Sequence, residues 1–502
     1  MPKVKPVVSL SSQCINRIKS SLKMFEIPLD VNLIATWRGS PWDRKRKRTG
    51  SESDINHFQT MPVVLLEAII QSLCSRKYTM DLKYFNIRFL ISTELQKLNA
   101  PSYPYDYEQF SNFFPKLEKL QVLVLCYSKI DDSCLKIIGT WCKNLRILDV
   151  NECDKLTDTG LEWLVPKTAE LSKTLQELLV TCPVVTKKGI IMALQNCPAL
   201  RVVENDHIFD VLVEVAQQSA ELAHTNFARL LLCPVGEYSS GQLGLVVRYC
   251  PSLFSVTISV KEGLTDIDLF CLTSLKNLQI LKFPCSGEED EEYDEDEEDN
   301  DEITFDLGLV PVLKVIGSSL QVLDLSYFEF VDIWTLVKFC PNLISLTFDN
   351  QCHSLSALSE NEIIQLRNEK GQVYFRHLKD LVCGFNLSHD ILFDLLSCPL
   401  LESVYIEYGD ALTDDLLQQV IANGFLKNLK LLSLESCDLV TKEGLDPLVI
   451  NDNNLEQIIF QFCEKITKQN VWDWLNFARR KNWKLRLEFQ NVDTKIKVFY
   501  ET

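Results

Sequence analysis

Residues that could support catalysis are few and scattered in this chain of 502 residues. Its six histidines are spread along the sequence, and none lies in a recognisable catalytic motif. The sequence lacks a glycine-rich phosphate loop, a zinc-protease helix and a nucleophile elbow. Its 18 cysteines include no Cys-x-x-Cys pair, which argues against a structural zinc site. We therefore expect no catalytic residue, no metal and no cofactor, and interpret the chain as a binding protein rather than an enzyme.

A sharper chemical pattern lies near the start of the chain, in SLSSQCINRI (residues 9–18). Leu10, Cys14 and Ile18 are four residues apart, so a helix would place them on one face. Ser9 is suited to cap that helix at its N-terminus. The face would present a protruding leucine, then a small cysteine that permits close approach, then an aliphatic side chain. Such a ridge is typical of a helix that docks in a groove of a partner.

This stretch resembles the elongin BC box, whose four defining positions are filled by Ser9, Leu10, Cys14 and Ile18. The resemblance implies that Leu10, Cys14 and Ile18 bind elongin C, in complex with elongin B. The same pattern occurs once more, at residues 335–344, where a proline would break a continuous helix. The alternative interpretation of residues 9–18 is a helix that caps the first apolar repeat of the chain.

The next stretch, FEIPLDVNLIATW (residues 25–37), resembles a cullin-2 box. Ile27, Pro28 and Val31 match that pattern, whereas Ala35 fits its last position poorly. The second proline of a cullin-5 box is absent. Together the two boxes are similar to a VHL box, which implies that Ile27, Pro28 and Val31 bind cullin-2.

A competing motif lies at residues 61–73, MPVVLLEAIIQSL, which resembles the opening of an F-box. An F-box would also make the chain a ubiquitin-ligase receptor, through a different adaptor. The later tryptophan-containing helix of an F-box is not evident in residues 75–90. The other interpretation of residues 61–73 is a core helix that leads into the repeats.

Most of the chain is a repeat of the form Leu-x-x-Leu-x-Leu followed by a turn and a helical stretch. Alternate leucines predict a short strand with one buried face, and the Thr or Asp that follows is suited to a helix N-cap. Each unit cannot bury its own apolar face, so neighbours must stack. Copies begin at Leu120, Leu145, Leu175, Leu200, Leu253, Leu278, Leu320, Leu343, Leu378, Leu401, Leu429 and Leu455, with a degenerate copy at Phe227 and a closing strand near 485–489.

The segments NECDKLTDTGLEWL (151–164) and ESCDLVTKEGLDPL (435–448) resemble cysteine-containing leucine-rich repeats. That subclass is common in substrate receptors of ubiquitin ligases. A VHL box ahead of such repeats is the arrangement of the zyg-eleven family and related cullin-2 receptors. The resemblance implies a substrate-recognition subunit of a cullin-RING ubiquitin ligase.

The predicted fold class is an α/β leucine-rich-repeat solenoid, a ribonuclease-inhibitor-like horseshoe with a helical N-terminal region. The expected organisation is a VHL-box-like segment (1–40), a basic linker (41–56), a helical cap (57–115), the repeats (116–490) with a disordered acidic insertion (286–304), and a C-terminal tail (491–502).

Repeat register predicts which side chains lie on the concave face, because positions three, five and seven alternate with the buried leucines. Acidic residues at these positions outnumber the two bases, Arg229 and Lys282. We therefore predict a groove for a basic protein or peptide. The acidic positions are Asp149, Glu177, Glu204, Asp206, Asp324, Asp349, Asp380, Glu407 and Glu435, and Tyr405 would add contact area.

The formal net charge of −18 comes largely from residues 288–302, which hold 13 acids and no base. The remaining chain is only mildly acidic, so we expect no direct binding of nucleic acid. No signal peptide or long apolar span is visible, and we expect no membrane association and a cytoplasmic or nuclear location with reduced thiols. The basic run RKRKR (44–48) is either a nuclear localisation signal or a solvated loop. A second hypothesis for the whole chain is an acidic scaffold or chaperone for basic nuclear proteins.

Overall fold

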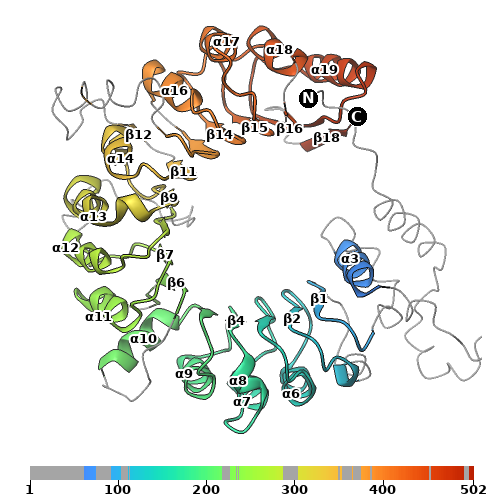
Figure 1. Ribbon diagram of the computed structural model, residues 1–502, viewed down its shortest axis with the longest axis vertical. Coiled ribbons are helices and arrows are strands. Elements are labelled where there is room, and N and C mark those ends of the chain that lie inside the picture. Colours follow the sequence, from blue (N-terminus) through green and yellow to red (C-terminus); the bar gives the residue numbers. More distant parts are fainter. Residues whose placement is uncertain are drawn as a thin grey trace, which may run out of the picture. The chain divides into compact units, whose positions relative to one another are not determined.

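The computed structural model describes residues 62–74, 92–102, 111, 114–217, 227–232, 234–235, 237–285, 303–348, 351–352, 365, 375–384, 387–451, 454–490 and 497–501. These residues form two compact units whose boundary falls inside helix α10 (Ile208–Gln217), between Val211 and Leu212. Figure 1 shows that both units consist of strand–helix repeats, with the helices on one side of the strands.

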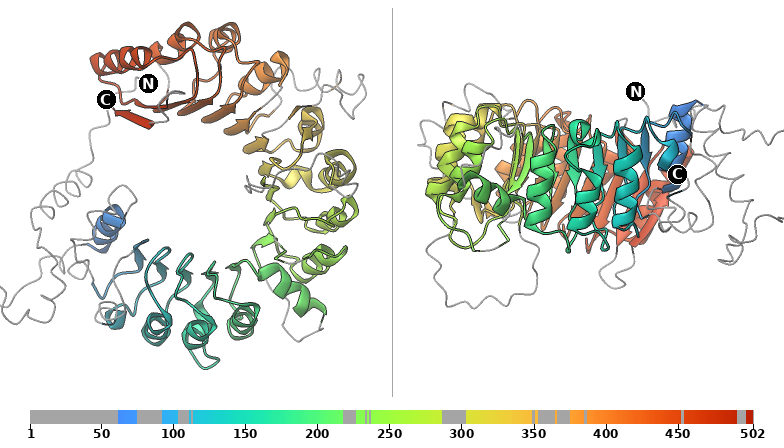
Figure 2. Two further views of the ribbon diagram at one scale, coloured as in Figure 1. Left: turned by 180° about the vertical axis from the view of Figure 1, so that it is seen from behind. Right: turned by 90° about the horizontal axis from the view of Figure 1, so that it is seen from below.

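The N-terminal unit contains five parallel strands among its described residues, paired in sequence order. Figure 2 shows the teal and green helices of this unit side by side, on the same face of its sheet. Its elements are α3 (Val63–Cys74), β1 (Lys97–Asn99), η6 (Phe114–Lys116), β2 (Val122–Val124), α6 (Asp132–Trp141), β3 (Ile147–Asp149), α7 (Asp158–Leu164), α8 (Leu171–Thr174), β4 (Glu177–Leu179), α9 (Lys187–Asn196) and β5 (Val202–Glu204).

The C-terminal unit continues the same repeat from β6 to β17 and ends with an antiparallel strand, β18. A small parallel pair, β10 with β12, stands apart from the main sheet. The elements are β6 (Arg229–Leu232), α11 (Gln242–Tyr249), β7 (Ser255–Ile258), α12 (Asp266–Leu269), η7 (Phe270–Ser274), β8 (Ile280–Lys282), η8 (Phe305–Leu309), α13 (Val310–Ile316), η9 (Gly317–Ser319), β9 (Val322–Asp324), β10 (Phe330–Val331), α14 (Ile333–Phe339), β11 (Ser345–Phe348), β12 (Gln351–Cys352), β13 (Asp380–Cys383), α16 (His389–Leu396), β14 (Ser403–Glu407), α17 (Asp414–Ala422), β15 (Leu431–Glu435), α18 (Lys442–Ile450), β16 (Gln457–Gln461), α19 (Lys468–Arg480), β17 (Arg486–Gln490) and β18 (Lys497–Glu501).

The leucines of the repeat form the core, as the sequence predicts. In the repeat that contains β3, Leu145, Leu148 and Val150 are fully buried. Each strand buries alternate residues against the helix that follows, and parallel pairing stacks the next repeat on the first. The chain is therefore an α/β leucine-rich-repeat solenoid.

The solenoid begins one repeat earlier than the sequence analysis placed it. Strand β1 belongs to LQKLNA, which starts at Leu95 and carries Ala100 where other repeats have a large apolar residue. Residues 57–115, expected to be helical, therefore also contain a strand. The C-terminal tail likewise contains β18, which pairs with β17. Ile303 and Thr304, assigned from sequence to the acidic insertion, are described here, and Thr304 caps η8.

Cysteines that follow the strands link neighbouring repeats through the backbone. The thiol of Cys153 donates to the carbonyl oxygen of Leu125 at 3.3 Å, and that of Cys437 donates to the carbonyl oxygen of Ile406 at 3.5 Å. Burial raises the pKa of the Cys153 thiol to about 12, so this thiol is protonated at neutral pH. The arrangement fits a structural role for these buried cysteines.

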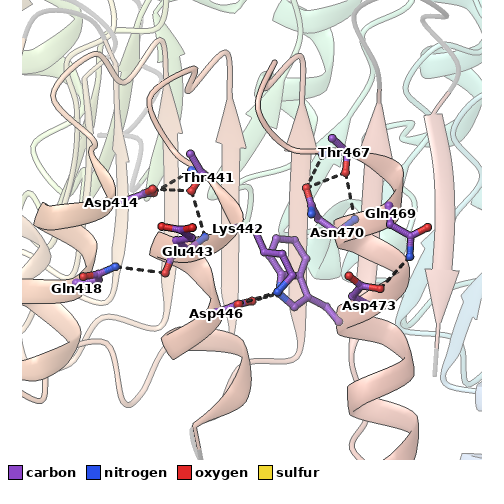
Figure 3. Close-up of polar contacts among 11 residues, drawn as sticks. Asp414, Gln418, Thr441, Lys442, Glu443, Asp446, Thr467, Gln469, Asn470 and Asp473 are labelled. Atoms are coloured by element: carbon purple, nitrogen blue, oxygen red, sulfur yellow. Dashed lines mark hydrogen bonds and ion pairs between the residues drawn. The ribbon is translucent and has the colours of Figure 1, made fainter.

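On the helical side, an aspartate at the start of one helix binds the threonine that caps the next. The carboxylate of Asp414 accepts hydrogen bonds from the backbone N–H of Thr441 at 2.8 Å and from its hydroxyl at 2.6 Å (Figure 3). Gly444 leaves room for this carboxylate, since an added Cβ would lie 2.2 Å from Asp414 Oδ1. The same bonds join Asp132 to Thr157, Asp158 to Thr186 and Asp266 to Thr304. We call these four pairs the Asp–Thr ladder.

The last repeat replaces the ladder with other polar contacts (Figure 3). Thr467 caps α19 in a reciprocal capping box with Asn470, and Asp446 accepts a hydrogen bond from the indole nitrogen of Trp474 at 2.7 Å. Trp474 is almost fully buried and stacks on Phe460, with ring centroids 5.6 Å apart. These contacts fix α19 against the repeat before it.

Candidate binding surface on the strand faces

The open face of each sheet is built from fixed positions of the repeat. In β3, Leu148 is buried whereas Ile147 and Asp149 are partly exposed. The register places Asp149 beside Leu179, and Leu179 beside Glu204. Equivalent positions in successive repeats therefore form rows of side chains that run across the strands. A ligand lying across such a row would contact one or two side chains from each repeat.

In the N-terminal unit, carboxylates from three neighbouring strands lie on this face. They are Asp149 on β3, Glu177 on β4 and Glu204 on β5, all partly exposed. Asn151 connects them, because its backbone N–H donates to Asp149 at 3.1 Å and its side-chain amide donates to Glu204 at 3.4 Å. Burial raises the pKa of Asp149, and the Asn151 N–H opposes that rise. Within the described part of the chain, neither Asp149 nor Glu177 forms an ion pair, and Asp206 is exposed just beyond β5.

In the C-terminal unit, an aromatic and acidic cluster lies on β14, β15 and β16. Glu407, Glu435 and Gln461 are side by side in register. The hydroxyl of Tyr405 donates to Glu435 Oε2, and Gln461 Nε2 donates to the same oxygen at 3.0 Å. Both donors are neutral, so they orient the carboxylate without cancelling its charge. Opposed carboxylates on adjacent strands destabilise a sheet, which makes this pair a candidate contact for a cation.

Two other acids that the sequence predicts on the strand faces, Asp324 and Asp380, differ in how available their carboxylates are to a ligand. Asp324 on β9 accepts hydrogen bonds from the backbone N–H of Ser326 at 3.2 Å and from its hydroxyl at 2.7 Å, so part of its capacity is used locally. Asp380 on β13 is exposed, and its pKa is raised by partial burial and then by the nearby charge of Glu402. The sequence could not distinguish them, because both occupy expected positions of the repeat.

Basic residues lie mainly at the edge of this region. Glu402 precedes β14 and pairs with Lys379 at 2.9 Å and with Lys430. These contacts lower the pKa of Glu402 and raise that of Lys430. One carboxylate and two ammonium groups leave a net charge of +1 at this edge, and such solvent-accessible ion pairs contribute little to stability.

Besides Lys97 of β1, sequence analysis missed a second base on the strand faces, Arg486 of β17. It lies in register with Gln457 and forms an ion pair with Glu488 at 3.0 Å. Glu488 is only 5% exposed and also accepts a hydrogen bond from Gln457 at 2.7 Å. The predicted bases Arg229 and Lys282 lie on β6 and β8. Aligning the final strand with the repeat would have found Arg486, although it lacks the opening leucine.

Several predicted positions lie outside the described residues. These are the elongin-binding residues Leu10, Cys14 and Ile18, the cullin-binding residues Ile27, Pro28 and Val31, the groove residue Asp349, the basic run 44–48 and the acidic run 288–302.

Within the F-box-like stretch, residues 63–73 belong to one helix, α3, which packs against the first strand. Its residues Leu66, Ile69 and Ile70 are buried. Glu67 accepts hydrogen bonds from the backbone N–H groups of Gln96 at 3.0 Å and Lys97 at 2.8 Å. These bonds satisfy donors at the exposed edge of β1, so α3 covers the end of the sheet.

The part of the chain described here contains no group of three or more His, Cys, Asp and Glu side chains arranged to hold a metal ion. Among its helices, none has the length and apolar character needed to span a bilayer.

No family model and no curated protein matches the chain. Among solved structures, the chain is similar to one in the crystal structure of the Rad7 and Elc1 complex in yeast, with 15% identity, a TM-score of 0.46 and coverage of 93% of this chain and 96% of that one. It is similar to an internalin, InlF, from Listeria monocytogenes, with 15% identity, a TM-score of 0.35 and coverage of 78% and 89%. It is also similar to a chain of the TLR13–ssRNA13 complex, with 16% identity, a TM-score of 0.34 and coverage of 78% and 57%.

Proposed function

We propose that this protein is the substrate-recognition subunit of a cullin-RING ubiquitin ligase that contains elongin B, elongin C and cullin-2. The N-terminal motif would attach the chain to the ligase, and the strand faces would hold a protein substrate. The receptor itself would catalyse no reaction and need no cofactor. Its contribution would be specificity and a raised effective concentration of substrate near the transferase. Such a receptor would act in the cytoplasm or nucleus.

The observation that carries this proposal is the spacing of Leu10, Cys14 and Ile18 ahead of Ile27 and Pro28, in a chain whose remainder is a repeat solenoid. A solenoid offers a broad binding face, and the N-terminal motif supplies a second, separate one. Two faces for two partners are what an adaptor between ligase and substrate requires.

Co-purification with elongins B and C tests the attachment step. We expect the wild-type chain to form a complex and the Leu10→Asp, Cys14→Asp variant to lose it, because charges are costly in an apolar groove. The matched control is Ser12→Asp, Asn16→Asp, which adds the same charge to the same segment on another helical face. Failure of the wild type to bind elongins, or equal loss in both variants, would contradict the proposal. Circular dichroism checks that each variant is folded.

The substrate face is tested with a fluorescent nona-arginine peptide as a basic probe. Reversal of Glu407 and Glu435 to lysine should weaken binding at least about tenfold, because two attractive charges become repulsive. The control reverses Asp415 and Glu443, which are exposed acids on the helices of the same repeats. If the strand-face variant and the helix control bind the peptide equally, the net charge of the chain attracts the peptide, and the strand face is not its binding site.

The second candidate function is an acidic scaffold or chaperone for basic nuclear proteins. It is favoured by the carboxylates on the strand faces together with the 13 acids at 288–302. The two functions separate in the co-purification, since only the ligase receptor requires elongins. An F-box-type receptor is a further form of the first proposal, with α3 as its adaptor-binding helix.

A further inference from the structure

The end of α19, the turn after it and the first residue of β17 carry a cluster of five exposed bases in a chain whose net charge is −18. We call this the α19 basic cluster. No acid occurs between its first and last members. The cluster consists of Arg479, Arg480, Lys481, Lys484 and Arg486.

Four of these bases form no ion pair with any residue that the structure describes. Arg486 pairs with Glu488, but no carboxylate in the described part of the chain forms an ion pair with the other four. The nearest acid on the helix, Asp473, already accepts a hydrogen bond from Gln469 at 2.9 Å. Among the described residues, therefore, no carboxylate pairs with these four positive charges.

The helix dipole does not account for this cluster. Cations in a last helical turn are stabilising, which would explain Arg479 and Arg480. However, Lys484 and Arg486 follow the end of the helix. Helices of similar length elsewhere in the solenoid, α6, α9, α17 and α18, have no base in the last turn at all. Solvation of a terminal repeat needs polar residues, but it does not need a single sign of charge.

The platform beneath the cluster is rigid. The backbone N–H of Lys481 donates to Phe477 at 3.1 Å, and that of Trp483 donates to Ala478 at 2.9 Å, which closes the end of the helix. The rings of Phe477 and Trp483 meet edge to face, with centroids 5.6 Å apart. The backbone that carries the charged groups is therefore already ordered before a ligand binds, and only their side chains would lose conformational freedom.

Aromatic contacts fix two of the bases. The guanidinium of Arg479 lies 5.9 Å from the ring centre of Trp472, and the ammonium of Lys481 lies 5.9 Å from that of Phe477. Proteins that bind single-stranded nucleic acid keep aromatic faces open for bases to stack on. Here Arg479 covers Trp472, and Trp483 is 5% exposed. These features disfavour nucleic acid and favour a partner that offers only negative charge.

From these observations we infer that the α19 basic cluster is a docking site for an acidic protein segment, a run of Asp and Glu on a partner of this chain. The site lies on the terminal repeat, apart from the acidic cluster on β14–β16. The chain would then bind a basic partner on its strands and an acidic partner at its C-terminal end. Like other exposed charge pairings, the second contact would weaken with salt.

The test uses the full chain and a fluorescent peptide of fifteen glutamates, with binding measured by anisotropy. A second protein, in which residues 288–302 become a Gly-Ser spacer of equal length, removes the chain's own acidic run as a competitor. We expect the peptide to bind the wild-type chain, the protein with the spacer, or both. The variant Arg479→Glu, Arg480→Glu, Lys481→Glu, Lys484→Glu should bind at least about tenfold more weakly, since four attractive surface charges become repulsive.

The matched control reverses four exposed lysines of the N-terminal unit and changes the net charge equally. It should bind within about twofold of the wild type, because these lysines lie outside the cluster. A neutral variant with glutamine at the four cluster positions replaces the reversal if that protein fails to fold. The control substitutions are Lys155→Glu, Lys167→Glu, Lys173→Glu and Lys188→Glu.

Three outcomes would overturn the inference. The peptide could bind neither protein, or the control could lose as much affinity as the cluster variant. A fifteen-nucleotide oligo-dT could also bind more tightly than the peptide with the same sensitivity to the cluster variant, which would assign the site to nucleic acid.

Discussion

The helical side and the strand side of this solenoid use carboxylates in opposite ways. On the helical side, Asp414 receives two hydrogen bonds from Thr441 of the next repeat, and the Asp–Thr ladder repeats this contact (Figure 3). On the strand side, the hydrogen-bond donors to the Glu435 carboxylate among the described residues are Tyr405 and Gln461, both neutral. Helix carboxylates therefore join repeats, whereas strand carboxylates keep a charge that a partner can meet.

The contrast extends to proton binding. Burial alone would raise the pKa of Asp268 near the start of α12, but hydrogen bonds from Gly241, Thr265 and Ser240 lower it below the ordinary value. Asp149 on β3 is also partly buried, and one N–H is too little to prevent a raised pKa. Asp268 is the more buried of the two, at 6% exposed, and yet its pKa is lowered, because only the helix carboxylate has enough hydrogen-bond donors.

The largest expected effect comes from closing the space that the ladder occupies. Gly444→Ala would place a methyl group 2.2 Å from Asp414 Oδ1, so the Asp414–Thr441 contact must break or the helices must separate. We expect a loss of about 2–4 kcal/mol of unfolding free energy. The control is Gly244→Ala in α11, where the nearest atom to the new Cβ would be 3.8 Å away. Urea unfolding of both variants measures the difference, and equal midpoints would refute it.

Removal of a carboxylate from the Asp–Thr ladder should lower the unfolding free energy by less than the steric clash of Gly444→Ala. Asp414→Ala leaves the N–H and hydroxyl of Thr441 without their acceptor, for a loss of about 1–3 kcal/mol. Glu435→Ala should change stability by less than about 1 kcal/mol, since its partners are partly exposed. Urea denaturation compares the two. A larger loss for Glu435→Ala would contradict the division between the two sides.

A smaller effect should come from Asp268, whose contribution to the unfolding free energy depends on pH. Its folded pKa is lowered, so its contribution is present above the ordinary carboxyl pKa and is lost as pH falls toward the folded value. Asp268→Asn should destabilise the protein by about 1–2 kcal/mol at neutral pH, and by less in acid. Melting temperatures of both proteins across the acidic range test this. A deficit that stays constant with pH would contradict it.

The smallest expected effect is at Asp149, where removal of the charge should stabilise the protein rather than destabilise it. Its raised folded pKa means that the charged form is disfavoured in the folded state, and this penalty grows as pH rises above the ordinary carboxyl pKa. Asp149→Asn should therefore stabilise the protein at neutral pH by less than about 1 kcal/mol, with no gain in acid. The same melting series measures it. Destabilisation at neutral pH would show that the charge has a partner there.

Much of the fold could be predicted from sequence because the repeat is local. Leucine spacing locates each strand, and Thr157, in the predicted capping region, caps α7 as expected. Strand β1 was missed because Ala100 weakens the pattern, although α3 and the next strand still complete its packing. Asp324 was predicted as a groove acid, but the sequence could not reveal that Ser326 binds its carboxylate.

The sequence by itself determined the repeat, the direction in which each strand side chain points, and the excess of acids on one face. Those properties follow from side-chain alternation within a few residues. Only the tertiary structure decided which acids are used internally and which bases of the described residues form ion pairs. Each of those depends on donors and charges that lie a whole repeat away, such as Thr441 for Asp414. Stacking of the repeats brings such distant residues together, and spacing alone does not encode their contacts.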